Sequence, residues 1–429
     1  MAYLGQSPVV GRYSLCDDIS SGFNGSTTAF SLTASSAAIK PGTARNLLLS
    51  LGGVIQKPET DFTVSGSSLT FTTAPASGLA FFALILGDAY AVGTPSDNTV
   101  LPASIYSGYQ LGTVDGQNNT LLGSTAGDSF TGTSAIHNTL IGYAAGTAIT
   151  TGDANTFIGS YAGDATTTAG NNIAVGTYAL TGNTTGTRNT VVGKDAAYAN
   201  TTGNDNTIYG YNGLANNTTG ASNVAVGSYS LDANTTASNN IGIGFYALST
   251  NTTGANNVAI GTKALEDSTT SSSHVAVGYN ALMNNTTANS NTAVGRDALR
   301  TTTTGQENTA IGHNALYSNT AHENTAVGYR AMITNSSGSG TAVGTMALSA
   351  QTTGTHNTGV GYSVLKENTT GTNNIAVGSY ALDANTTASD NTAIGTWALS
   401  SNTTGHSNTA SGLNSLAANT TGSYNAAHG

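Results

Sequence analysis

A chain of 429 residues in which only 7% are charged and 54 are glycine differs from typical globular domains, in which roughly 25% of residues are charged. Its formal net charge of −10 comes without any basic run, which excludes a nucleic-acid partner, and its single cysteine, Cys16, excludes an intrachain disulfide framework and a cysteine-based metal site. Disordered chains are poor in β-branched and aromatic residues, whereas here 38% of residues are apolar and recur in register, so the composition predicts an ordered structure built from small side chains.

The first ten residues, MAYLGQSPVV, contain neither the basic region nor the apolar stretch of a secretory signal. We therefore expect a protein made in a cytosol and released from it only by lysis. The longest apolar run, LAFFALIL from Leu79 to Leu86, is too short to cross a bilayer, which takes about 20 residues. No membrane insertion is expected.

Residues 1–105 predict a small β-sandwich with its own core. The segments FNGSTTAFSLTASSAAI, ARNLLLSLGGVIQ and LAFFALILGD have the composition of strands and are separated by Gly, Pro, Asn and Ser clusters. The segment TDFTVSGSSLTFT alternates apolar and polar residues on both sides of a Ser-Gly turn, which is typical of a hairpin. Residues 106–118 predict a connector to the rest of the chain.

A glycine then recurs from Gly123 to Gly429 at eighteen intervals, of which fifteen are 17 residues, two are 16 and one is 19. An asparagine stands four residues before this glycine in seventeen of the nineteen units, and His274 and Gly340 take its place in the other two. In a stack of equivalent units each column becomes a ladder, and asparagine ladders can bond amide to amide. The ladder positions predicted over four successive units are Asn172, Asn189, Asn206 and Asn223, with Gly176, Gly193, Gly210 and Gly227.

The 17-residue period predicts a β-solenoid over residues 119–429, because helical repeats and propeller blades need at least twice that length. Coils about 4.8 Å apart make a rod of roughly 85 Å. In the unit NIAVGTYALTGNTTGTRN we expect two short strands, with Ile173 and Val175 inside, Ala174 facing outward and Leu180 in the core. The Asn-Thr-Thr-Gly segment predicts a turn whose glycine accepts a positive φ. The outward alanine row would let a neighbouring chain approach closely, so we expect self-association.

No residue pattern indicates catalysis, a cofactor or a metal. The chain has no HExxH, GxSxG or Walker sequence, and the turns lack the aspartates of a calcium-binding β-roll. The adjacent acids Asp17-Asp18 and Glu266-Asp267 would point to opposite faces of an extended chain. We therefore expect a protein that is not an enzyme.

The two residues after each repeat glycine vary most and are often aromatic. One interpretation is that these rings cover the edge of the coil or pack between chains, and the other is that they stack on sugars. The aromatic residues in these two columns are Tyr143, Tyr161, Tyr178, Tyr211, Tyr229, Phe245, Tyr246, Tyr279, Tyr329, Tyr362, Tyr380 and Trp397. The candidate receptor contacts among them are Tyr161, Tyr178, Tyr229, Tyr246, Tyr380 and Trp397.

The repeat resembles the heads of trimeric autotransporter adhesins, whose NSVAIG-type units stack as a parallel β-roll in a trimer. The similarity rests on NNIAVG (Asn171 to Gly176), SNVAVG (Ser222 to Gly227) and NNVAIG (Asn256 to Gly261) and covers residues 119–429. It implies a parallel homotrimer. The period is longer than in that family, and we expect neither its signal peptide nor its C-terminal membrane anchor.

Residues 1–105 resemble the N-terminal region of tail fibres from phages of cyanobacteria. The similar segments are GQSPVVGRYSLCDDISSGFNGSTTAFSLT, PGTARNLLLSLGGVIQKPETDFTVSGSSLTFTTAPASG and FFALILGD. The resemblance implies attachment to adaptor or nozzle proteins of a phage tail, assembly in the host cytoplasm and a place on the virion as a tail appendage. The partner at the host surface would be a receptor, with glycans as one candidate class.

The sequence therefore predicts a trimeric phage tail fibre, and leaves three points open. A bacterial or prophage-encoded surface adhesin is the alternative. An ice-binding solenoid is less favoured, because the adjacent threonines are expected in turns, where their side chains diverge. The last repeat glycine, Gly429, has no capping element after it, and we expect that a distal part or a separate protein caps the rod.

Overall fold

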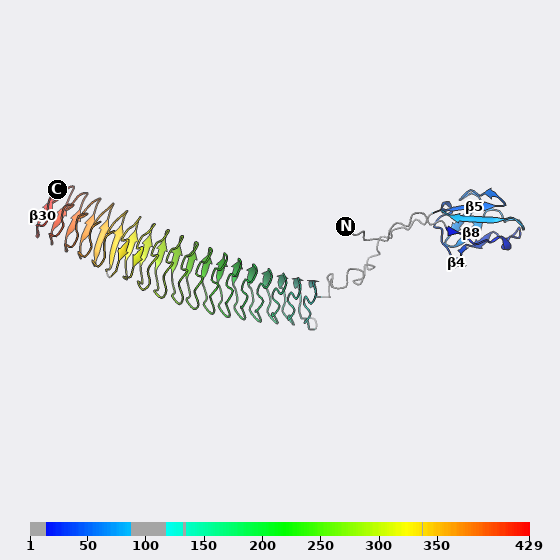
Figure 1. The fold of residues 1–429 in the computed structure, drawn as a ribbon, viewed down its shortest axis with the longest axis horizontal. Helices are drawn as coiled ribbons and strands as arrows, with labels where there is room; N and C mark the ends of the chain where they lie inside the picture. The colour runs from blue at the N-terminus through cyan, green and yellow to red at the C-terminus, as the bar shows by residue number, and fades with distance from the viewer. Residues whose placement is uncertain (1–13, 87–116, 132–133, 337) are drawn as a thin grey trace. The chain divides into compact units, whose positions relative to one another are not determined.

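The computed structural model describes residues 14–86, 117–131, 134–336 and 338–429, and over these ranges the chain is all-β apart from two short 3-10 turns, η1 (Ser20–Gly22) and η2 (Ala44–Asn46). The chain divides into two compact units, Met1–Leu101 and Pro102–Gly429, which are described separately (Figure 1). Of the predicted connector, residues 106–116 lie outside the described residues.

The N-terminal unit contains two antiparallel sheets around one core. The strand order is β1-β9-β5-β6 in the first sheet and β2-β8-β7 in the second, with a separate β3-β4 pair. The strands are β1 (Ser14–Leu15), β2 (Ala29–Ser31), β3 (Thr33–Ala34), β4 (Ala37–Ala38), β5 (Leu47–Leu51), β6 (Val54–Ile55), β7 (Phe62–Ser65), β8 (Ser68–Phe71) and β9 (Phe81–Ile85). Strands β7 and β8 form the predicted hairpin, pairing Phe62 with Phe71. Leu49 of the first sheet and Leu69 of the second belong to the same buried cluster.

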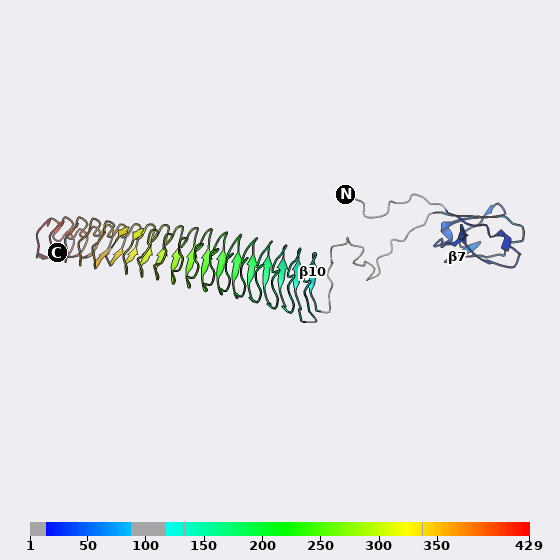
Figure 2. The same ribbon diagram turned by 60° about the horizontal axis from the view of Figure 1, so that its bottom comes forward.

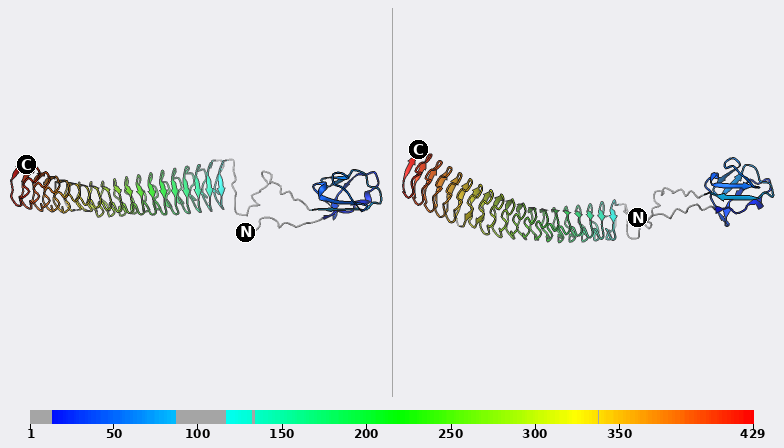
Figure 3. Two further views of the ribbon diagram at one scale, coloured as in Figure 1. Left: turned by 90° about the horizontal axis from the view of Figure 1, so that it is seen from above. Right: turned by 45° about the horizontal axis from the view of Figure 1, so that its top comes forward.

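The second unit is a β-solenoid in which one parallel sheet of nineteen strands follows the chain from β10 to β30. Its strands lie one above another on one side of the coils, and the solenoid curves gently (Figures 2 and 3). Pairing is strictly in register, so that Ile173 lies beside Thr190 and Thr190 beside Thr207. The solenoid of about 18 turns therefore confirms the predicted fold class.

The strands of this sheet are β10 (Thr120–Leu122), β11 (Thr139–Ile141), β12 (Thr156–Ile158), β13 (Ile173–Val175), β14 (Thr190–Val192), β15 (Thr207–Tyr209), β16 (Val224–Val226), β17 (Ile241–Ile243), β18 (Val258–Ile260), β19 (Val275–Val277), β20 (Thr292–Val294), β21 (Thr309–Ile311), β23 (Thr325–Val327), β25 (Gly340–Val343), β26 (Asn357–Val360), β27 (Ile375–Val377), β28 (Thr392–Ile394), β29 (Thr409–Ser411) and β30 (Ala426–His428).

Each coil contributes one strand to this sheet, so the predicted second strand over the Ala-Leu segment is wrong. That segment is a left-handed turn in which Tyr178 and Leu180 have φ of 58° and 57°. An L-residue rarely adopts such a backbone, which is why the sequence does not reveal it. Among the described residues of the solenoid, a short second pair, β22 (Ser318–Asn319) with β24 (Thr334–Asn335), occurs only in the two 16-residue coils.

The strand side chains face opposite to the prediction. Ala174 is fully buried, whereas Ile173 is 42% exposed and Val175 is half-buried. The reason is the width of the coil, because alanine on the strand fits against the returning Leu180, which is also buried. A larger strand residue needs a smaller residue on the opposite wall, as Ile208 has in Gly213. The outward row therefore consists of aliphatic residues and threonine, and the alanine row is the core.

In the first three coils the large residue lies on the strand and the small residue lies on the opposite wall, so the total volume inside the coil is limited in the same way. They carry Leu121, Leu140 and Phe157 at the buried strand position, and glycine replaces leucine on the opposite side of each coil. A Cβ on Gly163 would overlap the Phe157 ring, and one on Gly146 would lie 3.0 Å from a Leu140 methyl carbon. A large residue on one wall is thus matched by the smallest residue on the other.

The glycine of Asn-Thr-Thr-Gly is required because the backbones of two neighbouring coils approach each other closely at this turn. Gly176, at the end of its strand, has φ of 138°, but Gly186, in the turn, does not have a positive φ, so that part of the prediction is wrong. A Cβ on Gly186 would collide with the side-chain oxygen of Asn183 and the carbonyl of Gly203 in the next coil. The turn therefore stacks directly on its neighbour.

Candidate functional surfaces

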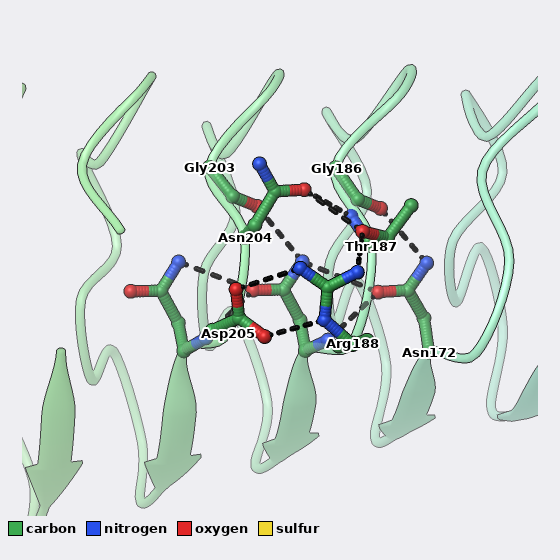
Figure 4. Close-up of polar contacts among 9 residues, drawn as sticks. Asn172, Gly186, Thr187, Arg188, Gly203, Asn204 and Asp205 are labelled. Atoms are coloured by element: carbon green, nitrogen blue, oxygen red, sulfur yellow. Dashed lines mark hydrogen bonds and ion pairs between the residues drawn. The ribbon is translucent and has the colours of Figure 1, made fainter. Parts of the chain in front are cut away.

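The predicted asparagine ladder runs inside the solenoid (Figure 4). Asn189 Nδ2 donates to Asn172 Oδ1 at 3.2 Å and to the Gly203 carbonyl at 2.9 Å, and the Asn189 backbone N–H donates to Asn172 Oδ1 at 2.9 Å. The same set of bonds recurs at Asn206 and Asn223. These bonds confirm the ladder and satisfy amides that are otherwise costly to bury.

A second ladder, at positions where the residue pattern predicts only a turn, is formed by the asparagine of Asn-Thr-Thr-Gly. Asn200 Nδ2 donates to Asn183 Oδ1 at 2.9 Å, and Asn217 Nδ2 donates to Asn200 Oδ1 at 2.7 Å. On the outside of the same turns, Arg188 forms an exposed ion pair with Asp205 at 2.6 Å (Figure 4). Exposed pairs contribute at most about 1 kcal/mol, so the buried amides hold the coils together here.

His274 takes the place of asparagine in the first ladder and is almost completely buried. Its Nδ1 accepts a bond from the Asn291 backbone N–H at 3.1 Å, and its Nε2 lies 2.7 Å from the Ala288 carbonyl. A proton on Nδ1 would face the Asn291 N–H, and burial disfavours the charge, which lowers the pKa of His274 to about 4. The coil therefore requires the neutral imidazole.

We expect the stability of the solenoid to fall as the pH falls from about 6.5 to about 4. The unfolded chain binds the proton near pH 6.5, and folded His274 binds it only near pH 4, so the loss reaches about 3 kcal/mol at low pH. Thermal unfolding between pH 7.5 and pH 4 measures it. The His274→Asn variant restores the ladder amide and is expected to lose this dependence.

The comparison with that variant separates His274 from the opposing effect of Asp232. Burial raises the pKa of Asp232 to about 6, so this carboxyl stabilises the folded state as the pH falls through that value. The Asp232 contribution is the same in both proteins. An identical pH dependence of the two proteins would contradict the assignment to His274.

One outward column of the sheet is aliphatic over nearly its whole length. It consists of the last residue of each strand, and sixteen of the nineteen are aliphatic. In order these residues are Leu122, Ile141, Ile158, Val175, Val192, Val226, Ile243, Ile260, Val277, Val294, Ile311, Val327, Val343, Val360, Val377 and Ile394, with Tyr209, Ser411 and His428 at the other three positions. All are half-buried or exposed. We call this set the aliphatic column.

A parallel column on the same face is rich in threonine. It consists of the outward residue two positions before the aliphatic column, and threonine occupies twelve of the nineteen positions. The adjacent threonines of the Asn-Thr-Thr-Gly segments lie in bends, as expected, whereas these strand threonines form an array on one face. These residues, the threonine column, are Thr120, Thr139, Thr156, Thr190, Thr207, Thr292, Thr309, Thr325, Thr341, Thr358, Thr392 and Thr409.

The six candidate aromatic contacts lie in three stacked pairs from neighbouring coils. Tyr161 stacks on Tyr178 with centroids 5.1 Å apart and planes 8° apart. The Tyr229–Tyr246 pair has values of 5.0 Å and 4°, and the Tyr380–Trp397 pair has values of 4.2 Å and 8°. The structure thus brings together each pair of successive candidates and places the three pairs in different parts of the solenoid.

The remaining titratable residues form no centre with an evident chemistry. Among the described residues, no group of three or more His, Cys, Asp or Glu side chains could hold a metal ion. The ring of His313 packs at 5.5 Å against Tyr329, and that of His406 at 5.0 Å against Tyr424. Over the same part of the chain, no helix is both long and apolar enough to cross a membrane. Comparisons with known protein families, curated proteins and solved structures find no match to this chain.

Proposed function

We propose that this chain is the subunit of a trimeric phage tail fibre, a structural virion protein without catalytic activity. In this proposal the solenoid is the shaft and takes part in attachment to the host surface, and residues 1–105 attach it to the tail. The observation that carries the proposal is the aliphatic column, which leaves an apolar stripe along nearly the whole length of the sheet. Contiguous exposed apolar surface of this kind marks an interaction site.

A second copy of the chain is the partner that this face fits best. Nineteen strands of three residues cover on the order of 800 Å², which is about what one partner contributes to a specific interface. Strands repeat about every 4.8 Å along the face, and a partner must share that spacing to match it from end to end. Another copy of the solenoid has the same strand spacing because it has the same sequence. The number of three copies rests on the resemblance to trimeric adhesin heads.

Two measurements test the proposal. Sedimentation equilibrium of the full chain is expected to give the mass of three chains, and immunogold labelling with antibody to the solenoid is expected to mark the tail appendages of virions. Unlabelled tails would overturn the tail-fibre function. Labelling of the surface of living, unlysed bacteria would support the adhesin alternative instead.

The threonine column supports a second candidate function, ice binding. Its hydroxyls lie in a flat, regular array beside the aliphatic column, and such an array can order water. This function needs the same face to be free of other chains. A monomeric protein that shows thermal hysteresis would favour ice binding, and a trimer without hysteresis would exclude it.

A further inference from the structure

We propose that the solenoid carries three equivalent binding sites for neutral or N-acetylated sugars, each made of three aromatic rings and one aspartate. This inference rests on the proposed role in host attachment and specifies its ligand. The first site contains Tyr143, Tyr161, Tyr178 and Asp164. The second contains Tyr211, Tyr229, Tyr246 and Asp232. The third contains Tyr362, Tyr380, Trp397 and Asp383.

The three sites share one geometry. In each site, the first ring belongs to the residue directly after a repeat glycine. It packs edge-on against the middle ring, which belongs to the residue two positions after the glycine of the next coil. The middle ring stacks on the third ring, at the same position one coil further along. The edge-on pairs have centroid distances of 5.2, 5.4 and 5.3 Å and interplanar angles of 78°, 88° and 70°. The same arrangement is therefore built three times.

The rings are not needed to stack the coils. The column that holds Tyr161 and Tyr178 holds Asn212, Lys263 and Asn280 in other coils, with the same left-handed backbone. Those coils stack in the same register. Because polar residues serve equally well in the fold, the aromatic residues at these positions call for another explanation.

The rings also remain accessible to a ligand. Tyr143 is 52% exposed and Trp397 is 41% exposed, whereas a ring used for core packing would be buried. Because the three rings of each site come from three successive coils, the surface fits an extended polymer better than a small molecule. Aromatic rings offer apolar surface to the C–H faces of a sugar, and tyrosine hydroxyls offer hydrogen bonds to its rim.

An aspartate stands at the same place in the middle coil of each site, five residues after the glycine. In Asp164 and Asp383 one carboxylate oxygen is buried without a hydrogen-bond partner in the described structure, a state that in native proteins requires an explanation. Burial raises the pKa of both carboxyls. The buried oxygen itself is closed to a ligand, but both residues are only half-buried, so a sugar hydroxyl would donate to the other oxygen of the carboxylate.

The net negative charge of the solenoid favours uncharged sugars over acidic ones. Residues 106–429 contain fifteen acidic and seven basic residues, and each site adds its own carboxyl, so an acidic polysaccharide would be repelled. Neutral and N-acetylated sugars avoid this repulsion. The sites lie four and nine coils apart, which corresponds to about 19 and 43 Å. A polymer that contacts several sites gains avidity even if each contact is weak.

The single tryptophan of the chain, Trp397, provides a direct test of the third site. Its fluorescence is measured in the full chain during titration with maltohexaose, cellohexaose, mannohexaose and chitohexaose, with oligogalacturonate as the acidic probe. We expect a saturable blue shift with at least one neutral or N-acetylated oligosaccharide and no shift with oligogalacturonate.

Two variants of equal charge locate the effect. The Asp383→Asn substitution is expected to weaken binding at least tenfold, because the amide is a poorer acceptor than the carboxylate. Asp390→Asn, at an exposed position in the bend before the next strand, is the matched control and should bind like the wild type. Tyr380→Ala should abolish the shift, with far-ultraviolet circular dichroism confirming the fold.

Three outcomes would overturn the proposal. They are the absence of a shift with every neutral oligosaccharide, equal weakening by both aspartate substitutions, and dissociation of the assembly by Tyr380→Ala, which would make the rings subunit contacts. Each of these can occur while virion tails are labelled, so the failure of the sugar sites is distinct from the failure of the tail-fibre function.

Discussion

Replacing Ile243 and Ile311 together with aspartate is expected to convert the proposed trimer into single chains. Both residues belong to the aliphatic column and are 37% and 41% exposed in one chain. In a trimer the same face is covered, and each carboxylate would lose its water at a cost of several kcal/mol. The two positions are four coils apart, about 19 Å, so the new charges are screened from each other and the solenoid itself should persist.

Sedimentation equilibrium gives the result directly, and circular dichroism reports whether the coils remain. The matched control is Thr253→Asp with Thr304→Asp, which adds the same charge at exposed positions in two equivalent turns, Asn-Thr-Thr-Gly at 251–254 and Thr-Thr-Thr-Gly at 302–305. This control should remain trimeric. If both double variants stay trimeric, the chains associate through another surface and the assignment of the aliphatic column is wrong.

The second large effect concerns the narrow interior. Ala276→Leu alone is expected to destabilise the solenoid by about 1–3 kcal/mol, because the buried strand position has no room for more atoms. Leu282→Gly alone should cost about 2–5 kcal/mol through the cavity that it leaves. The double variant reproduces the Leu140–Gly146 arrangement of an earlier coil, and we expect it to be more stable than either single variant.

Chemical denaturation of the four proteins gives the coupling energy as a double-mutant cycle. A favourable coupling of 1 kcal/mol or more supports the exchange of volume across the coil. Additive effects would show that the two positions do not share space. Ser228→Ala, on a half-buried residue outside the core, serves as the control and should change the stability little.

The repeat period, the strand positions and the asparagine ladder could be predicted from the sequence because each depends on spacing. The direction of the strand side chains could not, because Val-Ala-Val alternation suggests that the larger residues are buried. That rule fails where the interior is too narrow for them and the apolar surface has another use. The signal that could have corrected it is the pairing of Leu121, Leu140 and Phe157 with glycines on the opposite wall.

The candidate surfaces were predictable in part. A 17-residue period places equivalent aromatic residues above one another, so the pairing of Tyr161 with Tyr178 follows from spacing alone. The edge-on contribution of Tyr143 and the buried carboxylate of Asp164 did not follow. They depend on the left-handed turn after each strand, in which Tyr178 and Leu180 have positive φ. Neither tyrosine nor leucine is a residue type that indicates such a backbone.

The ladders also determine how the solenoid carries force. The bonds between two neighbouring coils point along the axis, and they include strand backbone bonds, amide bonds such as Asn206 to Asn189 at 3.1 Å, and threonine bonds such as Thr201 Oγ1 to the Thr218 carbonyl at 2.9 Å. A pull on the two ends loads all of them at once. A coil that is drawn away from its neighbour along the axis must break them together, so the stacking resists axial tension.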